Sequence, residues 1–128
     1  MTNKRTCLYQ KHVALGALMQ PFGGFDMPMQ YSSIIEEHNA VRNDCGVFDV
    51  SHMGEVTVKG KDAEHYVNHI FTNDITNSPI GKIYYGMMLY PDGGTVDDLL
   101  VYKMAPNDFF IVMNASNIEK DVKWMQEN

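Results

Sequence analysis

The stretch that decides the fold is KIYYGMMLYPDGGTVDDLLVYKM, residues 82–104. Residues 82–90 and 95–104 have strand character, and the PDGG between them has the Pro, Asp and Gly residues that suit a tight connection. We therefore predict an antiparallel hairpin in which Asp92 serves the turn. The second segment also carries two adjacent carboxylates, Asp97 and Asp98, in an otherwise apolar run.

Downstream of the hairpin, APND predicts a second turn into a strand at residues 108–114. Ser116 followed by Glu119 forms a capping box, which predicts a final helix through Trp124. Upstream, apolar residues recur on one helical face from Ala63 to Phe71, so a helix beginning near Asp62 is expected to pack on a sheet.

Residues 47–60 are predicted to be extended, because apolar and polar residues alternate before Gly60. Ser33 and Glu36 form another capping box, predicting a helix over residues 33–44 with Gly46 at its C-terminal cap. The first 31 residues show no sustained period and are predicted to be irregular with one short helix. The predicted fold class is α+β, with helices packed on an antiparallel sheet.

Composition and charge exclude several classes of protein. A chain of 128 residues with 45% hydrophobic residues is expected to fold around one core, as one modest domain or part of a larger one. A net charge of -6 without a basic run argues against nucleic-acid binding. No apolar segment approaches the roughly 20 residues that span a membrane, and the N-terminus lacks a signal-peptide core. We expect a cytoplasmic protein, or one of an organelle matrix, with Cys7 and Cys45 free.

The two aspartates are predicted to point to opposite faces of their strand. Alternation places Asp98 with Val96, Leu100 and Tyr102, and Asp97 with Leu99, Val101 and Lys103. A carboxylate near buried surface has a raised pKa unless it is paired, which is a condition for accepting a proton near neutrality. Backbone hydrogen bonds or a lysine partner would explain the same residues, so the pattern alone leaves both readings open.

Three strings carry a resemblance to a known family: FGGFDMPMQYSSIIEEHNAVRNDCGVFDVSHMGEV, GGTVDDLLVYK and NASNIEKDVKW. They follow one another in order over nearly the whole chain and resemble the N-terminal portion of the aminomethyltransferase of the glycine cleavage system, the T-protein. The resemblance implies transfer of a one-carbon unit from the aminomethyl-lipoyl arm of the H-protein to tetrahydrofolate, with release of ammonia.

The resemblance also assigns site residues. Asp98 is the expected catalytic carboxylate, facing a ligand cavity and assisting proton movement at the folate nitrogen N10, whereas Asp97 faces elsewhere. Leu100 and Tyr102, with Val96, would form an apolar wall for a flat ring. Met53, Tyr85 and Asn114 match family positions near the pterin. Taken without the resemblance, Met53 could fill a core, Tyr85 could pack in its strand and Asn114 could cap a helix.

The histidines suggest no metal site, because His12, His38, His52, His65 and His69 lack the spacing of a zinc motif. Nucleotide-binding and serine-hydrolase motifs are also absent from the sequence.

The family's chains are about three times longer than this one. Residues 1–128 are therefore expected to form the N-terminal part of the folate-binding domain, inactive by itself and prone to self-association through uncovered apolar surface. Two alternatives stay open: a free-standing, non-catalytic folate- or protein-binding module, and the folate domain of an enzyme like dimethylglycine or sarcosine dehydrogenase.

Overall fold

The predicted hairpin is present in the computed structural model, which describes residues 2–128. Strand β5 (Ile83–Leu89) pairs antiparallel with β6 (Thr95–Ala105). The turn role of Asp92 is confirmed, because its carboxylate accepts a hydrogen bond of 2.9 Å from the backbone N–H of Gly94.

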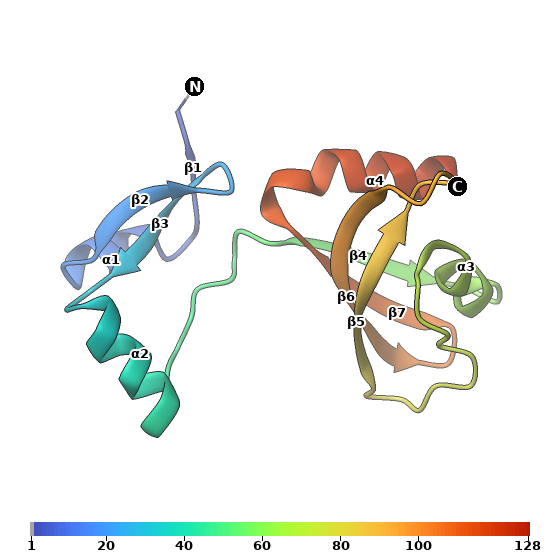
Figure 1. The fold of residues 1–128 in the computed structure, drawn as a ribbon, viewed down its shortest axis with the longest axis horizontal. Coiled ribbons are helices and arrows are strands. Elements are labelled where there is room, and N and C mark those ends of the chain that lie inside the picture. Colours follow the sequence, from blue (N-terminus) through green and yellow to red (C-terminus); the bar gives the residue numbers. More distant parts are fainter. Residues whose placement is uncertain (1) are drawn as a thin grey trace. The chain divides into compact units, whose positions relative to one another are not determined.

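The hairpin belongs to a four-stranded antiparallel sheet. β6 also pairs with β7 (Asp108–Met113), and β7 pairs with β4 (Gly54–Lys59), giving the order β4-β7-β6-β5. Helices α3 (Ala63–Ile70) and α4 (Ile118–Glu127) pack against this sheet (Figure 1). The α+β fold class and the helix predicted near Asp62 are thereby confirmed.

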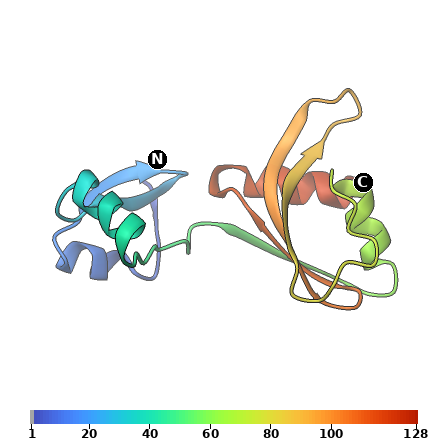
Figure 2. The ribbon, with the colours of Figure 1, turned by 60° about the horizontal axis from the view of Figure 1, so that its bottom comes forward.

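One face of the sheet forms the core together with both helices. Buried side chains of α3 and α4 belong to the same apolar cluster as inward-facing strand residues, and the turned view shows both helices with the sheet (Figure 2). The fully buried members of this cluster are Val67, Ile75, Met88, Val101, Phe109, Ile111 and Met113. The opposite face is covered by none of the helices that supply this core, so its strand residues remain partly exposed.

The last helix begins later than predicted. A single 3-10 turn (Ala115–Asn117) precedes α4, and Ser116 forms no capping box, because Asn117 is the N-cap and makes no side-chain cap bond. The first residue of α4 lies tightly against β4: a Cβ added to Gly54 would lie 2.6 Å from Ile118 Cγ1. Gly54 therefore allows the start of α4 to approach the sheet.

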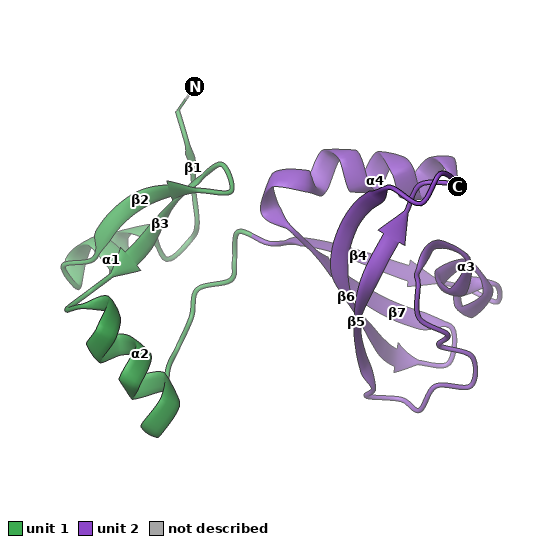
Figure 3. Cartoon of the chain, viewed as in Figure 1, with its two compact units in different colours: residues 1–52 green, residues 53–128 purple. Residues whose placement is uncertain are grey.

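The chain divides into two compact units at His52/Met53, and the apolar core described above lies entirely in the second (Figure 3). In the first unit we predicted irregular structure with one helix. The helix is present as α1 (Tyr9–Ala14), but strands β2 (Leu18–Phe22) and β3 (Phe25–Gln30) form a hairpin that the prediction missed. Its turn is Gly23-Gly24, both with positive φ, and β1 (Lys4–Arg5) pairs parallel with β3.

Helix α2 (Ile34–Asn43) confirms the Ser33 cap, whose hydroxyl accepts the N–H of Glu36 at 3.2 Å. The C-cap prediction for Gly46 is wrong, because the helix ends at Asp44 and Gly46 does not have a positive φ. Gly46 is instead a point of close approach, where an added Cβ would lie 2.5 Å from Val41 Cγ2.

The strand predicted at residues 47–60 is shorter than expected, because only Gly54–Lys59 is β-structure. The Asp49 carboxylate accepts the backbone N–H of Ser51 at 2.9 Å, a local turn that interrupts the extended chain. Among the described residues of the first unit, Met27 is the single buried apolar side chain, so this unit lacks an apolar core of its own.

Candidate functional site

The two adjacent aspartates lie on opposite faces of β6, as predicted. Asp97 points to the core and is 5% exposed, whereas Asp98 is half-buried on the open face. A shift of register between Met88 and Leu89, opposite Thr95, marks an irregularity at the start of β6. Val96 is also turned into the core, at 2% exposure, so the prediction that it shares an apolar wall with Asp98 is wrong.

Asp98 is held by two side chains. The Tyr85 hydroxyl donates to Oδ2 at 2.7 Å, and the Asn114 amide donates to Oδ1 at 3.2 Å and to the Asp98 carbonyl at 3.0 Å. The hydrogen bond and the negative charge of Asp98 raise the pKa of Tyr85, so its hydroxyl remains a donor. The structure thus brings three of the predicted site residues together around one carboxylate.

Asn114 also joins the site to the core. Its amide donates to Asp97 Oδ1 at 3.1 Å, and the Asn117 amide donates to the same oxygen at 2.9 Å. Burial opposes ionisation of Asp97, but donors from Asp121, the two asparagines and the Asp98 backbone outweigh it, and the pKa of Asp97 is lowered. The alternative role for Asn114 as a helix cap does not hold, because it makes no side-chain cap bond.

A raised carboxyl pKa does occur here, but at a residue that the sequence did not single out. Asp121 of α4 is fully buried, and burial followed by its contact with Asp97 raises its pKa to about 7. Asp121 follows Ile118 by three residues and precedes Met125 by four, which places it on the apolar face of α4, so helical periodicity was the signal that could have marked it as a carboxyl group near the core.

The remaining predicted residues lie on or beside the open face. Leu100 is half-buried and pairs in register with Tyr85, and Tyr102 packs edge-on against Phe110 with ring centroids 5.8 Å apart. Met53 is half-buried and directly precedes β4. Continuing the register of the ladders places Met53, Asn114, Asp98 and Met87 in one row across four strands.

The open face is apolar around its polar centre. Ile83, Tyr85 and Met87 are 48%, 65% and 41% exposed, respectively. Asp98 was predicted to face a cavity, but it does not line the hollows of about 480, 310 and 500 Å³ found among the described residues. The site formed by this chain is therefore an uncovered sheet face.

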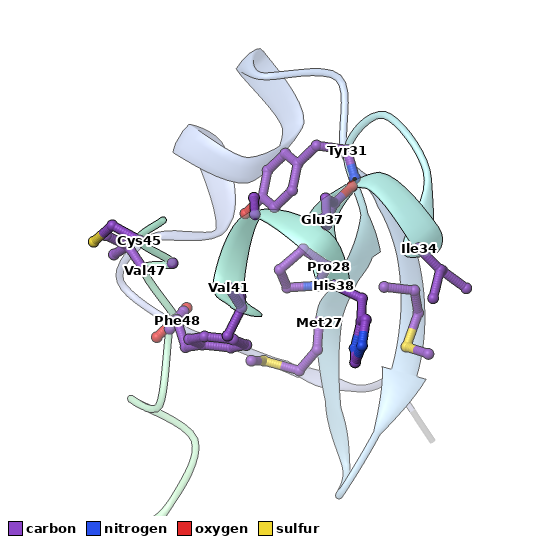
Figure 4. Close-up of a pocket in the computed structure, with 14 residues that line it drawn as sticks. Met27, Pro28, Tyr31, Ile34, Glu37, His38, Val41, Cys45, Val47 and Phe48 are labelled. Atoms are coloured by element: carbon purple, nitrogen blue, oxygen red, sulfur yellow. Dashed lines mark hydrogen bonds between the residues drawn. The ribbon is translucent and has the colours of Figure 1, made fainter. Parts of the chain in front are cut away.

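An apolar hollow with a volume of about 480 Å³ belongs to the first unit. Side chains of β3, of α2 and of the segment that follows α2 line it (Figure 4). None of the predicted site residues contributes to it. Its apolar members include Met27, Ile34, Val41, Val47 and Phe48.

The first unit also contains a polar cluster that sequence reasoning missed. His12 lies 2.8 Å from Asp49 Oδ2 through Nε2 and 2.7 Å from the Tyr31 hydroxyl through Nδ1, and Thr6 donates to the same Asp49 oxygen at 2.7 Å. Burial disfavours the Asp49 charge, but the hydrogen bonds from His12, Thr6 and Ser51 outweigh it and hold the pKa of Asp49 well below its usual range. This cluster ties α1 to the segments around it.

His52, which precedes Met53 in the sequence, has a structural environment in the first unit. His52 is 8% exposed and packs edge-on against Phe22 and Phe25.

Residues 2–128 contain no group of three or more His, Cys, Asp or Glu side chains that could hold a metal ion. Cys7 and Cys45 are both free and exposed. None of the helices in the described part of the chain is long and apolar enough to cross a membrane.

Comparison with known proteins identifies the family. Residues 8–128 match the family described as the GCVT N-terminal domain. The chain belongs to this family. Aminomethyltransferases of Moorella thermoacetica and Bacillus pumilus are 56% and 53% identical to it over 125 residues, covering 98% of this chain and 34% of each relative.

A solved structure has the same fold. The crystal structure of glycine cleavage system aminomethyltransferase T from Bartonella henselae matches with a TM-score of 0.92 and 31% identity, covering 97% of this chain and 35% of that one. The chain thus spans about a third of the length of the curated relatives it matches.

Proposed function

We propose that this chain forms part of the tetrahydrofolate site of an aminomethyltransferase of the glycine cleavage system. The whole reaction would transfer a one-carbon unit from the aminomethyl-lipoyl H-protein to tetrahydrofolate and release ammonia. The names of the relatives favour this function over the two alternatives that the sequence left open. The observation that carries it is the Asp98 carboxylate, fixed by Tyr85 and Asn114 on an apolar sheet face.

The residues of this face suit a flat, partly polar ligand. Leu100, Tyr102 and Met87 offer apolar surface to a ring, while Met53 and Asn114 lie at the end of the same face. An arylamine nitrogen is a weak nucleophile, because its lone pair is delocalised into the ring. A carboxylate within hydrogen-bond reach can orient such a nitrogen and take its proton as the new carbon bond forms.

Tyr85 and Asn114 would serve Asp98 in this reaction. Because each donates to a different oxygen of Asp98, the carboxylate has one fixed orientation instead of several rotamers. The remaining lone pairs of Asp98 stay free to accept from the substrate. Assembly with the lipoylated H-protein, completion of the folate site outside these 128 residues and self-association through the uncovered apolar surface are further parts of the proposal.

A chimera tests the function. This chain would replace the matching third of the Moorella thermoacetica relative, and ammonia release would be measured with aminomethyl-loaded H-protein and tetrahydrofolate. We expect turnover with the wild-type chain and a loss of about 100-fold or more with Asp98→Asn, which keeps shape but removes the proton acceptor. Asp62→Asn, an exposed control, should match the wild type.

Two results would contradict the proposal. A folded chimera without turnover would refute the function, and near-normal turnover of Asp98→Asn would refute the role of Asp98. Calorimetric titration of the 128-residue chain with tetrahydrofolate distinguishes the enzyme from the alternative of a free-standing, non-catalytic binding module. Binding by the chain combined with an inactive but folded chimera would favour the non-catalytic module.

A further inference from the structure

Two buried carboxyl groups meet behind the proposed site. Asp121 is 0% exposed, and neither of its oxygens accepts a hydrogen bond from a donor in the described part of the chain. Asp97 Oδ1 accepts both asparagine amides, whereas Oδ2 is buried without a donor. The geometry places the two groups side by side: Asn117, one helical turn before Asp121, donates to Asp97, and the Lys120 ammonium contacts both the Val96 carbonyl and Asp121 Oδ1, so each carboxyl group shifts the pKa of the other.

Two facing carboxylates cannot both be ionised in a buried position at reasonable cost, so the pair must share a proton. Asp97 receives amide donors, which favour its charged form, and Asp121 receives none. The proton therefore resides on Asp121. Since Asp97 Oδ1 is already occupied, the free Oδ2 is the acceptor for this proton, and one bond satisfies two of the orphaned groups.

The charged groups around Asp121 support this assignment. Asp97 of β6 disfavours its ionisation, and Lys120 of α4 favours it from 3.7 Å. Lys120 would compensate the charge of an ionised Asp121 only in part, because its ammonium group donates a hydrogen bond to the Val96 carbonyl. From α3, the Tyr66 hydroxyl reaches α4 but donates to the Met125 carbonyl instead. Burial and Asp97 together keep the Asp121 pKa raised, to about 7.

We propose that Asp121 is a positioning residue. Its protonated carboxyl group donates a hydrogen bond to Asp97 and thereby fixes the Asn114 amide that orients Asp98. The proposal rests on the function proposed above for Asp98. The contacts run without a gap from Asp121 to Asp97, from Asp97 to Asn114 and from Asn114 to Asp98. Loss of the proton would place two charges in contact and displace Asp97 together with the amide bound to it.

A nuclear magnetic resonance titration of the 128-residue chain tests the pair without using activity. Aspartate side-chain carboxyl carbons would be followed from about pH 4 to about pH 9, together with the Asn114 side-chain amide. We expect one carboxyl group with a midpoint near 7 and a change in the Asn114 amide with the same midpoint. Asp121→Asn should abolish both transitions, and Asp62→Asn should retain them.

A second variant covers the case in which Asp121→Asn does not fold. Asp97→Asn removes the neighbouring charge, so the Asp121 midpoint should fall while remaining above that of an exposed aspartate, because Asp121 is still buried. The proposal would be overturned if every aspartate titrated below about pH 5.5, or if the Asn114 amide did not respond to the transition.

Tetrahydrofolate titrations of the chimera described above, at several pH values, then separate this inference from the proposed function. Affinity of the chimera with the wild-type chain should fall about tenfold between about pH 6 and about pH 8.5, and that of the chimera with Asp121→Asn should stay constant, because the asparagine amide donates at every pH. A folded chimera that binds no folate, while the 128-residue chain shows the transition shared by Asp121 and Asn114, would refute the folate site and leave the pair intact. Equal pH dependence in both proteins would refute the positioning role.

Discussion

Replacing Asp121 by asparagine should stabilise the second unit at neutral pH, although the substitution removes an ionisable group from the buried face of α4. The asparagine amide has the same shape as a protonated carboxyl and can donate to Asp97 permanently. The wild-type residue must instead retain a proton, because its folded pKa of about 7 lies well above the ordinary value of 3.8.

The direction of the effect follows from proton binding. Between pH 3.8 and about pH 7 the folded state holds a proton on Asp121 that the unfolded state has lost, so stability decreases as pH rises and levels off above about 7. The lowered pKa of Asp97 acts only below its ordinary value of 3.8, outside this range. A difference of one pH unit between the folded and unfolded pKa corresponds to about 1.4 kcal/mol, or about 4 kcal/mol over the whole interval.

Urea unfolding measured through Trp124 provides the assay. This residue is the one tryptophan of the chain and packs against the core of the second unit, so its fluorescence follows that unit. Structural relaxation around the ionised pair reduces the full penalty, and we expect Asp121→Asn to be more stable by about 2–4 kcal/mol at about pH 8 and nearly equal at about pH 4.5. A difference independent of pH, or a less stable variant at pH 8, would refute the shared proton.

Three further substitutions test the packing and the first unit. Met88→Ala should lower the free energy of unfolding by about 2–5 kcal/mol, because this side chain is fully buried, whereas the exposed Met104→Ala should change it by less than about 0.5 kcal/mol in the same urea assay. Gly54→Ala should cost about 1–3 kcal/mol through overlap with Ile118, and adding Ile118→Ala should recover part of this loss; strictly additive costs would contradict the overlap. In the first unit, the carboxylate of Asp49 contributes stability above its ordinary pKa of 3.8 that is lost in acid. In nuclear magnetic resonance spectra, Asp49→Asn should therefore reduce the dispersion of the amide resonances of residues 2–52 at neutral pH. The loss of dispersion in acid should be smaller in this variant than in the wild type, and unchanged spectra would count against this role.

The second unit could be predicted from sequence because its signals are local. The turn residues around Asp92 predict a hairpin, and the apolar repeat beginning at Ala63 predicts a helix, each from a few neighbouring residues. The strands of the first unit gave weaker signals, because they bury almost no apolar side chains: among the residues of this unit that the structure describes, Met27 is the one buried apolar residue. Phe25, Met27 and Met29 alternate with other residues on one side of the Gly23-Gly24 turn, but Pro21 and Pro28 lie within the two strands, and proline argues against strand structure.

The site was predictable only as far as strand alternation and family resemblance reach. Alternation correctly separated Asp97 from Asp98, but it failed at Val96, because an irregular register shifts the faces of a strand. The contact between Asp97 and Asp121 joins residues of different elements through tertiary packing. Helical periodicity places Asp121 on the same face as Ile118 and Met125, but it does not identify Asp97 as the group that Asp121 contacts.

The row Met53-Asn114-Asp98-Met87 has a consequence for the order in which the chain folds. Met53 precedes β4 and Asn114 follows β7, whereas Asp98 and Met87 lie within β6 and β5, and β4 can join only through β7, the last strand in the sequence. The β5–β6 hairpin closes over a short loop, whereas docking of β4 on β7 must close a loop of about 50 residues, which is slower. An intermediate holding only the hairpin would therefore expose Asp98 beside Tyr85 but leave the row unfinished, and ligand affinity would arise as a late event of folding.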